Sequence, residues 1–352
     1  MSKVTENIFP IEWRMSDALK VPKHSYKVFG TFVCGGGSTM GYKLAGYDHL
    51  GGVEFTEHYG KVYQKNHNPK YFYLEDIRKF NERNDLPAEL YDLDILDGSP
   101  PCAAFSTSGA REKLWGKESE YEGKKQVKDD LVYVYCDTIE KLIPKVFILE
   151  NVSGLMKGNA KSYLKNVVSR LSEKYSVQVF LLYAASMGIP QTRNRVFVIG
   201  HRKDLALPKL QLDFECSQVG FGVTKKYWAN GGDSIEKYAI GSKWDEIAPG
   251  ESHPVRFSLK KPHPQKPCFV IQESDSNVST PGICHPYQKR KLNVDEVRML
   301  CTFPFDYNFM DVPPVSVMGR SVLPVMMANI SHQIYLQWLS KIPTITSDKT
   351  LK

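Results

Sequence analysis

The chain has 352 residues, of which 42% are hydrophobic and 24% are charged. This length allows one large or two modest domains, and the composition excludes a disordered tail, a collagen-like fibre or a low-complexity array. The formal net charge of +7 is compatible with a polyanionic partner but is too small to demonstrate one.

Seven cysteines are spread along the chain without the dense, even spacing of a secreted disulfide framework, which favours a reducing compartment. No two of them form a C-x-x-C pair and the histidines stand apart from them, so the sequence predicts no metal site. No apolar run reaches the roughly 18 residues of a membrane span, and the N-terminus lacks a signal-peptide core. We expect a cytoplasmic protein with no membrane partner.

After a polar extension over residues 1–25, short β-branched and aromatic runs alternate with amphipathic stretches. This alternation is typical of an α/β fold with crossover helices on a parallel sheet. The predicted strands span residues 27–34, 49–54, 93–97, 146–150, 177–184 and 195–200. The predicted helices between them span residues 39–45, 58–66, 130–142 and 160–174.

The pattern changes near His201, after which proline, glycine, lysine and aromatic residues crowd into a stretch of weak periodicity. This stretch predicts a small irregular lobe. Helical periodicity returns over residues 292–300 and 322–339, which we expect to pack back onto the sheet. The expected organisation is therefore an extension (1–25), a first domain (26–202), an inserted region (203–285) and a C-terminal part (286–345).

A glycine-rich turn at residues 34–38 follows the first predicted strand and leads into a helix. Such a turn lets the backbone approach a nucleotide-like ligand, although it also serves as an ordinary tight connection. The dinucleotide fingerprint G-x-G-x-x-G fails because Met40 occupies its third glycine position, which disfavours a pyrophosphate cofactor. A cofactor without phosphates, such as S-adenosylmethionine, uses the same fold with looser glycine spacing. Glu54 is placed to reach ribose hydroxyls, and Asp76 and Ile77 to border an adenine; each acid alone is more often a solvated surface residue.

Two further strand ends carry reactive side chains. Pro100 and Pro101 stiffen the exit from a strand and present the thiol of Cys102, which is a candidate nucleophile, although a lone cysteine is by default structural. Glu150 ends a hydrophobic strand and is a candidate acid. The segment 191–195 carries two arginines that can bind carbonyl oxygens, phosphates or Glu150, and such a pair usually marks a solvated edge.

In order and spacing, these motifs resemble those of the cytosine-5 DNA methyltransferase family. The matching features are Phe-x-x-x-Gly-Gly at residues 32–37, Pro-Pro-Cys at 100–102, Glu-Asn-Val at 150–152 and Gln-x-Arg-x-Arg at 191–195. The resemblance covers most of residues 27–340 and includes Gly-Arg-Ser-Val at 319–322. It implies a Rossmann-like S-adenosylmethionine-dependent methyltransferase sheet with helices on both faces, and a target-recognition region at 203–285.

The resemblance also implies roles for single residues. Cys102 would attack carbon 6 of a flipped cytosine, Glu150 would protonate its nitrogen 3, and Arg195 would meet its carbonyl oxygen beside Arg193. The residues implied to bind the cofactor are Phe32, Gly36, Gly37, Glu54, Asp76, Ile77, Pro101 and Ser321. Those implied to contact the substrate are Ser106, Asn151 and Gln191.

The implied partner is double-stranded DNA. The resemblance further implies a monomeric modification enzyme from a bacterium or a phage, accompanied by a cognate restriction endonuclease. We expect basic residues of the inserted region, such as Lys226, Arg256 and Lys261, to grip the DNA. The sequence departs from the family pattern at Cys34, Ala103 and Arg320. Two alternatives stay open: a tRNA cytosine-5 methyltransferase, and a nucleic-acid-binding relative without turnover.

Overall fold

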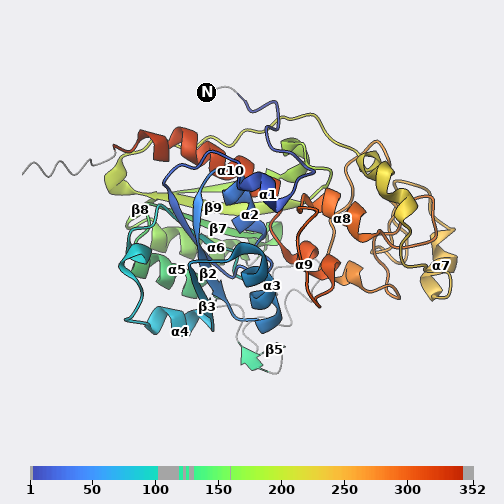
Figure 1. Ribbon diagram of the computed structural model, residues 1–352, viewed down its shortest axis with the longest axis horizontal. Coiled ribbons are helices and arrows are strands. Elements are labelled where there is room, and N and C mark those ends of the chain that lie inside the picture. The colour runs from blue at the N-terminus through green and yellow to red at the C-terminus, as the bar shows by residue number, and fades with distance from the viewer. Residues whose placement is uncertain (1–2, 102–118, 122–123, 127–130, 159, 344–352) are drawn as a thin grey trace, which may run out of the picture.

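The computed structural model describes residues 3–101, 119–121, 124–126, 131–158 and 160–343. Its centre is a seven-stranded sheet in the order β3-β2-β1-β4-β7-β9-β8 (Figure 1). The strands are β1 (Lys27–Thr31), β2 (Asp48–Glu54), β3 (Tyr71–Leu74), β4 (Ile95–Gly98), β7 (Val146–Val152), β8 (Tyr175–Tyr183) and β9 (Asn194–Arg202). A small antiparallel pair, β5 (Ser119–Tyr121) and β6 (Lys124–Gln126), lies apart from it.

Strand β9 runs antiparallel to both of its neighbours, β7 and β8, whereas the other ladders of the sheet are parallel. The expectation of a parallel sheet is therefore wrong at this edge. The reason is the short connection over residues 184–193, since a parallel return requires a crossover of about a dozen residues or more. Strand β3 was not predicted.

Alternate residues of the strands face two separate hydrophobic cores. Val28 and Ile148 belong to one core, while their chain neighbours Phe29 and Phe147 belong to the other. The first core is covered by α2 (Gly37–Leu44), α3 (Glu57–His67) and α10 (Pro324–Gln337). The second is covered by α4 (Ile77–Glu82), α5 (Leu131–Leu142) and α6 (Ala160–Leu171), so helices lie on both faces, as predicted.

The C-terminal part returns to the sheet through α8 (Val294–Cys301), α9 (Pro314–Arg320) and α10. The continuous helix predicted over 322–339 is wrong at its start, because Ser321 and Leu323 are extended and Pro324 occupies the first turn of α10. The N-terminal extension contains the short helix α1 (Met15–Ala18). It was predicted to be a polar extension, but part of it is buried against the C-terminal part of the chain. The indole of Trp13 is buried and donates to the Thr302 carbonyl oxygen at 2.8 Å.

The inserted region contains α7 (Ala239–Trp244) and the 3-10 helices η6 (Lys203–Leu205), η7 (Phe221–Asn230) and η8 (Glu273–Ser276), and the rest of it is irregular. In Figure 1 the part of it that contains α7 lies to one side of the sheet, in yellow and orange. Part of it has a small core of its own, formed by Ile235, Ile240, Ile247, Leu259 and Cys284. Leu210 and Phe214, by contrast, pack into the main core, and the boundaries at 203 and 285 stay a prediction.

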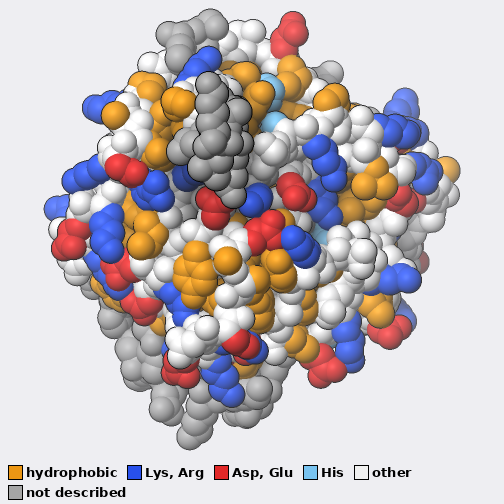
Figure 2. Space-filling view, turned by 60° about the vertical axis from the view of Figure 1, so that its left-hand side comes forward, with side chains coloured by type: hydrophobic (Ala, Val, Ile, Leu, Met, Phe, Trp, Pro, Cys, Tyr) orange, Lys and Arg blue, Asp and Glu red, His pale blue; other side chains and the backbone are white. Residues whose placement is uncertain are grey.

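None of the helices in the described part of the chain is both long and apolar enough to cross a bilayer. On the face drawn in Figure 2, Lys and Arg side chains are interspersed with Asp and Glu. The net positive charge is therefore not gathered into one patch among the described side chains of that face.

Candidate active site

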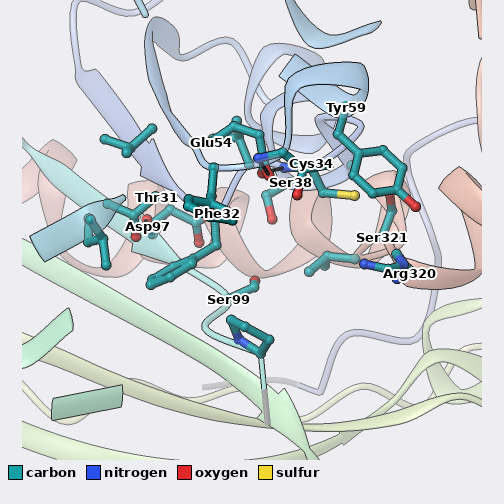
Figure 3. A pocket seen from close by; sticks show the side chains of 18 of the residues that line it. Thr31, Phe32, Cys34, Ser38, Glu54, Tyr59, Asp97, Ser99, Arg320 and Ser321 are labelled. Atoms are coloured by element: carbon teal, nitrogen blue, oxygen red, sulfur yellow. Dashed lines mark hydrogen bonds between the residues drawn. The ribbon is translucent and has the colours of Figure 1, made fainter. Parts of the chain in front are cut away.

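A cavity of about 450 Å³ opens at the carboxyl ends of the parallel strands (Figure 3). Its wall is built from the segments that follow β1, β2, β3 and β4, and from the junction between α9 and α10. This is the edge at which open α/β sheets bind ligands. Seven of the residues implied to bind a cofactor line it, namely Phe32, Gly37, Glu54, Asp76, Ile77, Pro101 and Ser321.

The turn after β1 is held in an unusual backbone conformation. Phe32 and Cys34 have φ values of 56° and 45°, in the left-handed region that costs about 1 kcal/mol for a residue other than glycine. Gly36 does not line the cavity: with φ at 73°, its absent side chain makes room for His67, whose Nε2 atom lies 2.2 Å from the ideal Cβ position. At Gly37 the same position lies 2.1 Å from the Val322 carbonyl oxygen. These glycines therefore serve close packing within the protein.

Glu54 joins two walls of the cavity. Its carboxylate accepts the backbone N–H of Cys34 and that of Thr56, each at 2.8 Å. Burial raises the pKa of Glu54, and the two backbone hydrogen bonds oppose that shift. The side chain thus fixes the turn after β1 against the turn after β2, and its carboxylate faces the cavity.

Asp76 and Ile77 begin α4 at the far wall. The Asp76 carboxylate accepts the Arg78 backbone N–H at 2.9 Å, which caps the helix, and pairs with the Arg78 guanidinium at 3.2 Å. Ile77 is buried and packs into the second core. A polar and an apolar edge therefore lie side by side, as expected for a site that borders an aromatic heterocycle.

A second cluster lies where β7 pairs with β9. The Arg195 Nε atom lies 3.0 Å from Oε1 of Glu150, and Glu150 is 8% exposed. Burial raises the pKa of the Glu150 carboxyl, and the positive charges of Arg195 and Arg193 oppose this. Glu150 is therefore a carboxyl group that holds its proton more tightly than an exposed one.

Asn151 connects this cluster to the segment that carries the candidate nucleophile. Its amide nitrogen donates to the Pro100 carbonyl oxygen at 3.1 Å, while its oxygen accepts the Val152 backbone N–H at 2.8 Å. Pro101 lines the cavity. Cys102 and Ser106 lie outside the described residues.

Arg193 and Gln191 are fixed by contacts inside the protein. Arg193 is 2% exposed and donates to the carbonyl oxygens of Ile271, Gly319 and Ser321 at 2.6 to 2.9 Å. Burial, reinforced by the Arg195 charge, lowers its pKa to about 9. Gln191 is fully buried and donates to the Leu300 carbonyl oxygen at 3.1 Å. Both residues hold the C-terminal part against β9, and neither lines the cavity.

Sequence reasoning missed three charged residues of the cavity wall, Glu75, Asp97 and Glu273. Asp97 precedes the last residue of β4 and could have been identified as a carboxylate near a strand's carboxyl end. Glu273 pairs with Arg320 at 2.6 Å, and the Arg320 guanidinium also lies 5.2 Å from the centre of the Tyr59 ring. Arg320 was singled out only as a departure from the family pattern.

The expected DNA grip is only partly accessible. Lys261 is 4% exposed, with its ammonium 3.3 Å from the centre of the Trp244 ring and donating to the Ile247 carbonyl oxygen. Lys226 pairs with Glu12. The expectation that Lys261 contacts a nucleic acid is therefore wrong, because its buried ammonium group binds the Trp244 ring and the Ile247 carbonyl oxygen within the inserted region. Arg256 stays exposed.

The fold is that of the Rossmann-like methyltransferases. A solved structure described as a DNA modification methyltransferase encoded within an Escherichia coli prophage superposes with a TM-score of 0.67, at 20% identity, over 89% of this chain and 99% of that chain. A mutant of Spodoptera frugiperda DNMT2 superposes with a TM-score of 0.63, at 16% identity, over 88% of this chain and 100% of that chain. At these identities the likeness concerns the fold.

Sequence comparison places the chain more narrowly. The family model for the C-5 cytosine-specific DNA methylase matches residues 26–224, and the chain belongs to this family. The Type II methyltransferase M.Sau96I of Staphylococcus aureus is 26% identical over 314 residues, covering 81% of this chain and 69% of the relative. M.FnuDI of Fusobacterium nucleatum is 30% identical over 193 residues, covering 54% of this chain and 52% of the relative. The chain thus spans about half the length of the second relative.

Proposed function

We propose that this protein transfers a methyl group from S-adenosylmethionine to carbon 5 of a flipped cytosine in a specific sequence of duplex DNA. The observation that carries this proposal is that motif residues from five separate segments, between Phe32 and Ser321, converge on one cavity at the carboxyl edge of the sheet. Family membership supplies the reaction class.

The cavity suits this cofactor in size and in charge. About 450 Å³ falls within the usual range of small-molecule sites. Five carboxyl groups and one guanidinium line it among the described residues, which favours a ligand with a net positive charge. When bound, S-adenosylmethionine supplies an electrophilic methyl sulfonium. Phe32, Asp76 and Ile77 would hold its adenine, and Glu54 its ribose.

Carbon 5 of cytosine is a poor nucleophile and requires activation. In the proposed reaction the Cys102 thiolate adds to carbon 6 while Glu150 delivers a proton to nitrogen 3, which leaves an enamine-like carbon 5. Transfer of the methyl group to carbon 5 would leave S-adenosylhomocysteine. Loss of the carbon 5 proton to a base would then expel the Cys102 thiolate, and return of the nitrogen 3 proton to Glu150 would restore the neutral aromatic ring. Arg195, already paired with Glu150, would also contact the cytosine carbonyl oxygen.

The remaining residues would position this machinery. Asn151 holds the Pro100 carbonyl and so fixes the base of the segment that leads to Cys102. Arg193 and Gln191 would brace the C-terminal part, and Ser106 would contact the DNA. Because a base inside a duplex is shielded, the target must be rotated out, at an unstacking cost of a few kcal/mol. The inserted region at 203–285 would supply the contacts that select the sequence.

Transfer of tritiated methyl from S-adenosylmethionine tests the proposal directly. Duplex DNA and tRNA are offered in parallel to the wild type and to Cys102→Ser. Labelling of DNA by the wild type alone supports the proposal, and bisulfite sequencing of DNA from expressing cells then identifies the site. Labelling of tRNA alone would establish the RNA alternative, and binding of DNA without labelling of either would establish a relative without turnover. Light scattering on the same protein preparation shows whether it is a monomer. Digestion of the modified DNA shows whether a restriction endonuclease is blocked at the methylated site.

A further inference from the structure

Asp97 is a buried carboxylate in the cavity wall that the proposed chemistry does not use. It is 3% exposed, and Figure 3 shows it among the lining side chains. The Tyr42 hydroxyl donates to its Oδ1 atom at 3.3 Å. Tyr42 belongs to α2, so the Asp97 side chain faces the helix that follows the glycine-rich turn. Ile77, at the expected adenine edge, belongs to the core on the opposite face of the sheet.

The other acidic residues of the wall are already engaged. Three are ion-paired with arginines at 2.6 to 3.2 Å and one accepts two backbone N–H groups: Glu75 with Arg83, Asp76 with Arg78, Glu273 with Arg320, and Glu54. Within the described part of the chain, no lysine, arginine or histidine lies within ion-pair distance of Asp97. Among the described residues, the cavity thus contains two buried carboxylates without a cation, Glu54 and Asp97, and of these Glu54 is already held by two backbone N–H groups.

The groups that face Asp97 are the Ser38 hydroxyl, which forms a hydrogen bond with it, three tyrosines and one acid. Tyr42 from α2, Tyr63 from α3 and Tyr135 from α5 have pKa values raised by burial, so all three are neutral near pH 7. Glu150 from β7 disfavours a second negative charge. Burial raises the pKa of Asp97 to about 7. A cation beside this carboxylate would therefore displace a proton.

We propose that Asp97 binds the α-ammonium group of the methionine part of the cofactor. This inference rests on the proposed function. If Asp76 and Ile77 border the adenine, the amino-acid part of the ligand extends toward the opposite side of the cavity, which faces α2. The ammonium then meets the Asp97 carboxylate, whose hydrogen-bond partners are neutral hydroxyl groups, in a setting where a charged hydrogen bond is stronger than in water.

Two ligands that differ in the amino-acid part test this assignment by calorimetry with the full chain. S-adenosylhomocysteine carries the ammonium, and 5′-methylthioadenosine lacks the whole amino-acid part. Asp97→Asn is expected to weaken binding of the first by about tenfold or more and of the second by less than about twofold. Asp213→Asn, the same substitution at an exposed aspartate outside the cavity wall, is the matched control and should change neither.

The pH dependence provides a second test, because only the ionised carboxyl binds the ammonium. With a pKa of about 7, affinity for S-adenosylhomocysteine should rise about fivefold from pH 6 to pH 7 in the wild type and in Glu150→Gln. It should stay level in Asp97→Asn. At pH 7 the wild type and Glu150→Gln should each release about half a proton per S-adenosylhomocysteine, and Asp97→Asn should release none. No proton release is expected with 5′-methylthioadenosine.

Three results would overturn the assignment: equal losses for both ligands, an unchanged pH dependence in Asp97→Asn, or no proton release by the wild type. None of these affects the proposed function if the wild type still binds S-adenosylhomocysteine and labels DNA. A folded wild type that binds neither ligand would overturn both. Should Asp97→Asn fail to fold, the proton release of the wild type still decides the question.

Discussion

Arg195 and Glu150 meet across the antiparallel ladder between β7 and β9. In this ladder Arg195 lies opposite Val152 and Glu150 lies opposite Phe197, so the two side chains are diagonal neighbours on one face. Their closest atoms, Nε and Oε1, are 3.0 Å apart. The reversed direction of β9 therefore places a guanidinium beside the carboxyl group that is proposed to protonate the base.

Glu150→Gln keeps the shape of this side chain and removes its acid function. Methyl transfer should slow by at least about 100-fold, the scale of general acid catalysis, while DNA binding is retained. Single-turnover kinetics and gel-shift titration measure the two properties separately. Unchanged turnover would exclude Glu150 as the acid.

Arg195→Met removes the cation and leaves the carboxyl of Glu150 buried without it. At pH 8 the free energy of unfolding should fall by about 2 to 3 kcal/mol, because the carboxylate then carries an uncompensated charge. At pH 5 protonation of Glu150 removes that charge, so the loss should be smaller. Urea denaturation at the two pH values measures the difference, and equal losses would show that the pair does not govern the charge of Glu150.

Asn151→Asp separates the two hydrogen bonds of this side chain. The acceptor for Val152 is kept, and the donor to the Pro100 carbonyl is lost. The turnover number should fall by about tenfold or more, because a small displacement of a reacting group lowers the rate steeply. Affinity for S-adenosylhomocysteine, measured by calorimetry, should change by less than about twofold. A fall in affinity with full turnover would contradict a positioning role.

Arg193→Met should destabilise the protein by about 3 kcal/mol or more, since three buried carbonyl oxygens lose their donor. Arg256→Met is the matched control at an exposed arginine and should lie within about 0.5 kcal/mol of the wild type. Thermal and urea unfolding compare the two variants. Similar stabilities would mean that the contacts of Arg193 are replaced by others after substitution.

Asp97 also predicts how stability depends on pH. Its pKa is raised to about 7 in the folded protein, above the value of about 3.9 in an unfolded chain. Its protonated form therefore stabilises the fold at low pH, and this contribution is lost as pH rises from about 4 through 7. The free energy of unfolding of the wild type should fall more over this interval than that of Asp97→Asn. Other buried carboxyls titrate in both proteins, so the difference between them isolates Asp97.

The sequence indicated most of the sheet because buried strands need hydrophobic residues, and β7, β8 and β9 each contain a run of them. It did not indicate the direction of β9, although the connection over 184–193, which contains Gly188 and Pro190, is too short for a crossover helix. Hydrophobic pattern reports burial and says little about direction. The direction of a strand relative to its neighbour depends on the length of the connection between them, and the hydrophobic pattern of the strands contains no information about that length.

Motif spacing likewise predicted which residues line the cavity better than what they contact. The two arginines of segment 191–195 illustrate this, because carbonyl oxygens and Glu150 were both open as partners. In the structure Arg193 binds carbonyl oxygens and Arg195 binds Glu150. The two arginines are two residues apart on one extended segment, yet their surroundings differ. The difference arises because the C-terminal part packs against β9 and supplies the carbonyl oxygens that Arg193 binds.

The close approach of the glycine-rich turn to the α9–α10 junction has a consequence during synthesis. Gly37 lies against Val322, and Gly41 leaves no space for a side chain beside the Pro324 carbonyl oxygen. One wall of the cavity thus comes from residues that the ribosome adds almost 300 positions after the turn. A nascent chain can form the first strands early, yet it has no complete pocket until this late segment has emerged and docked.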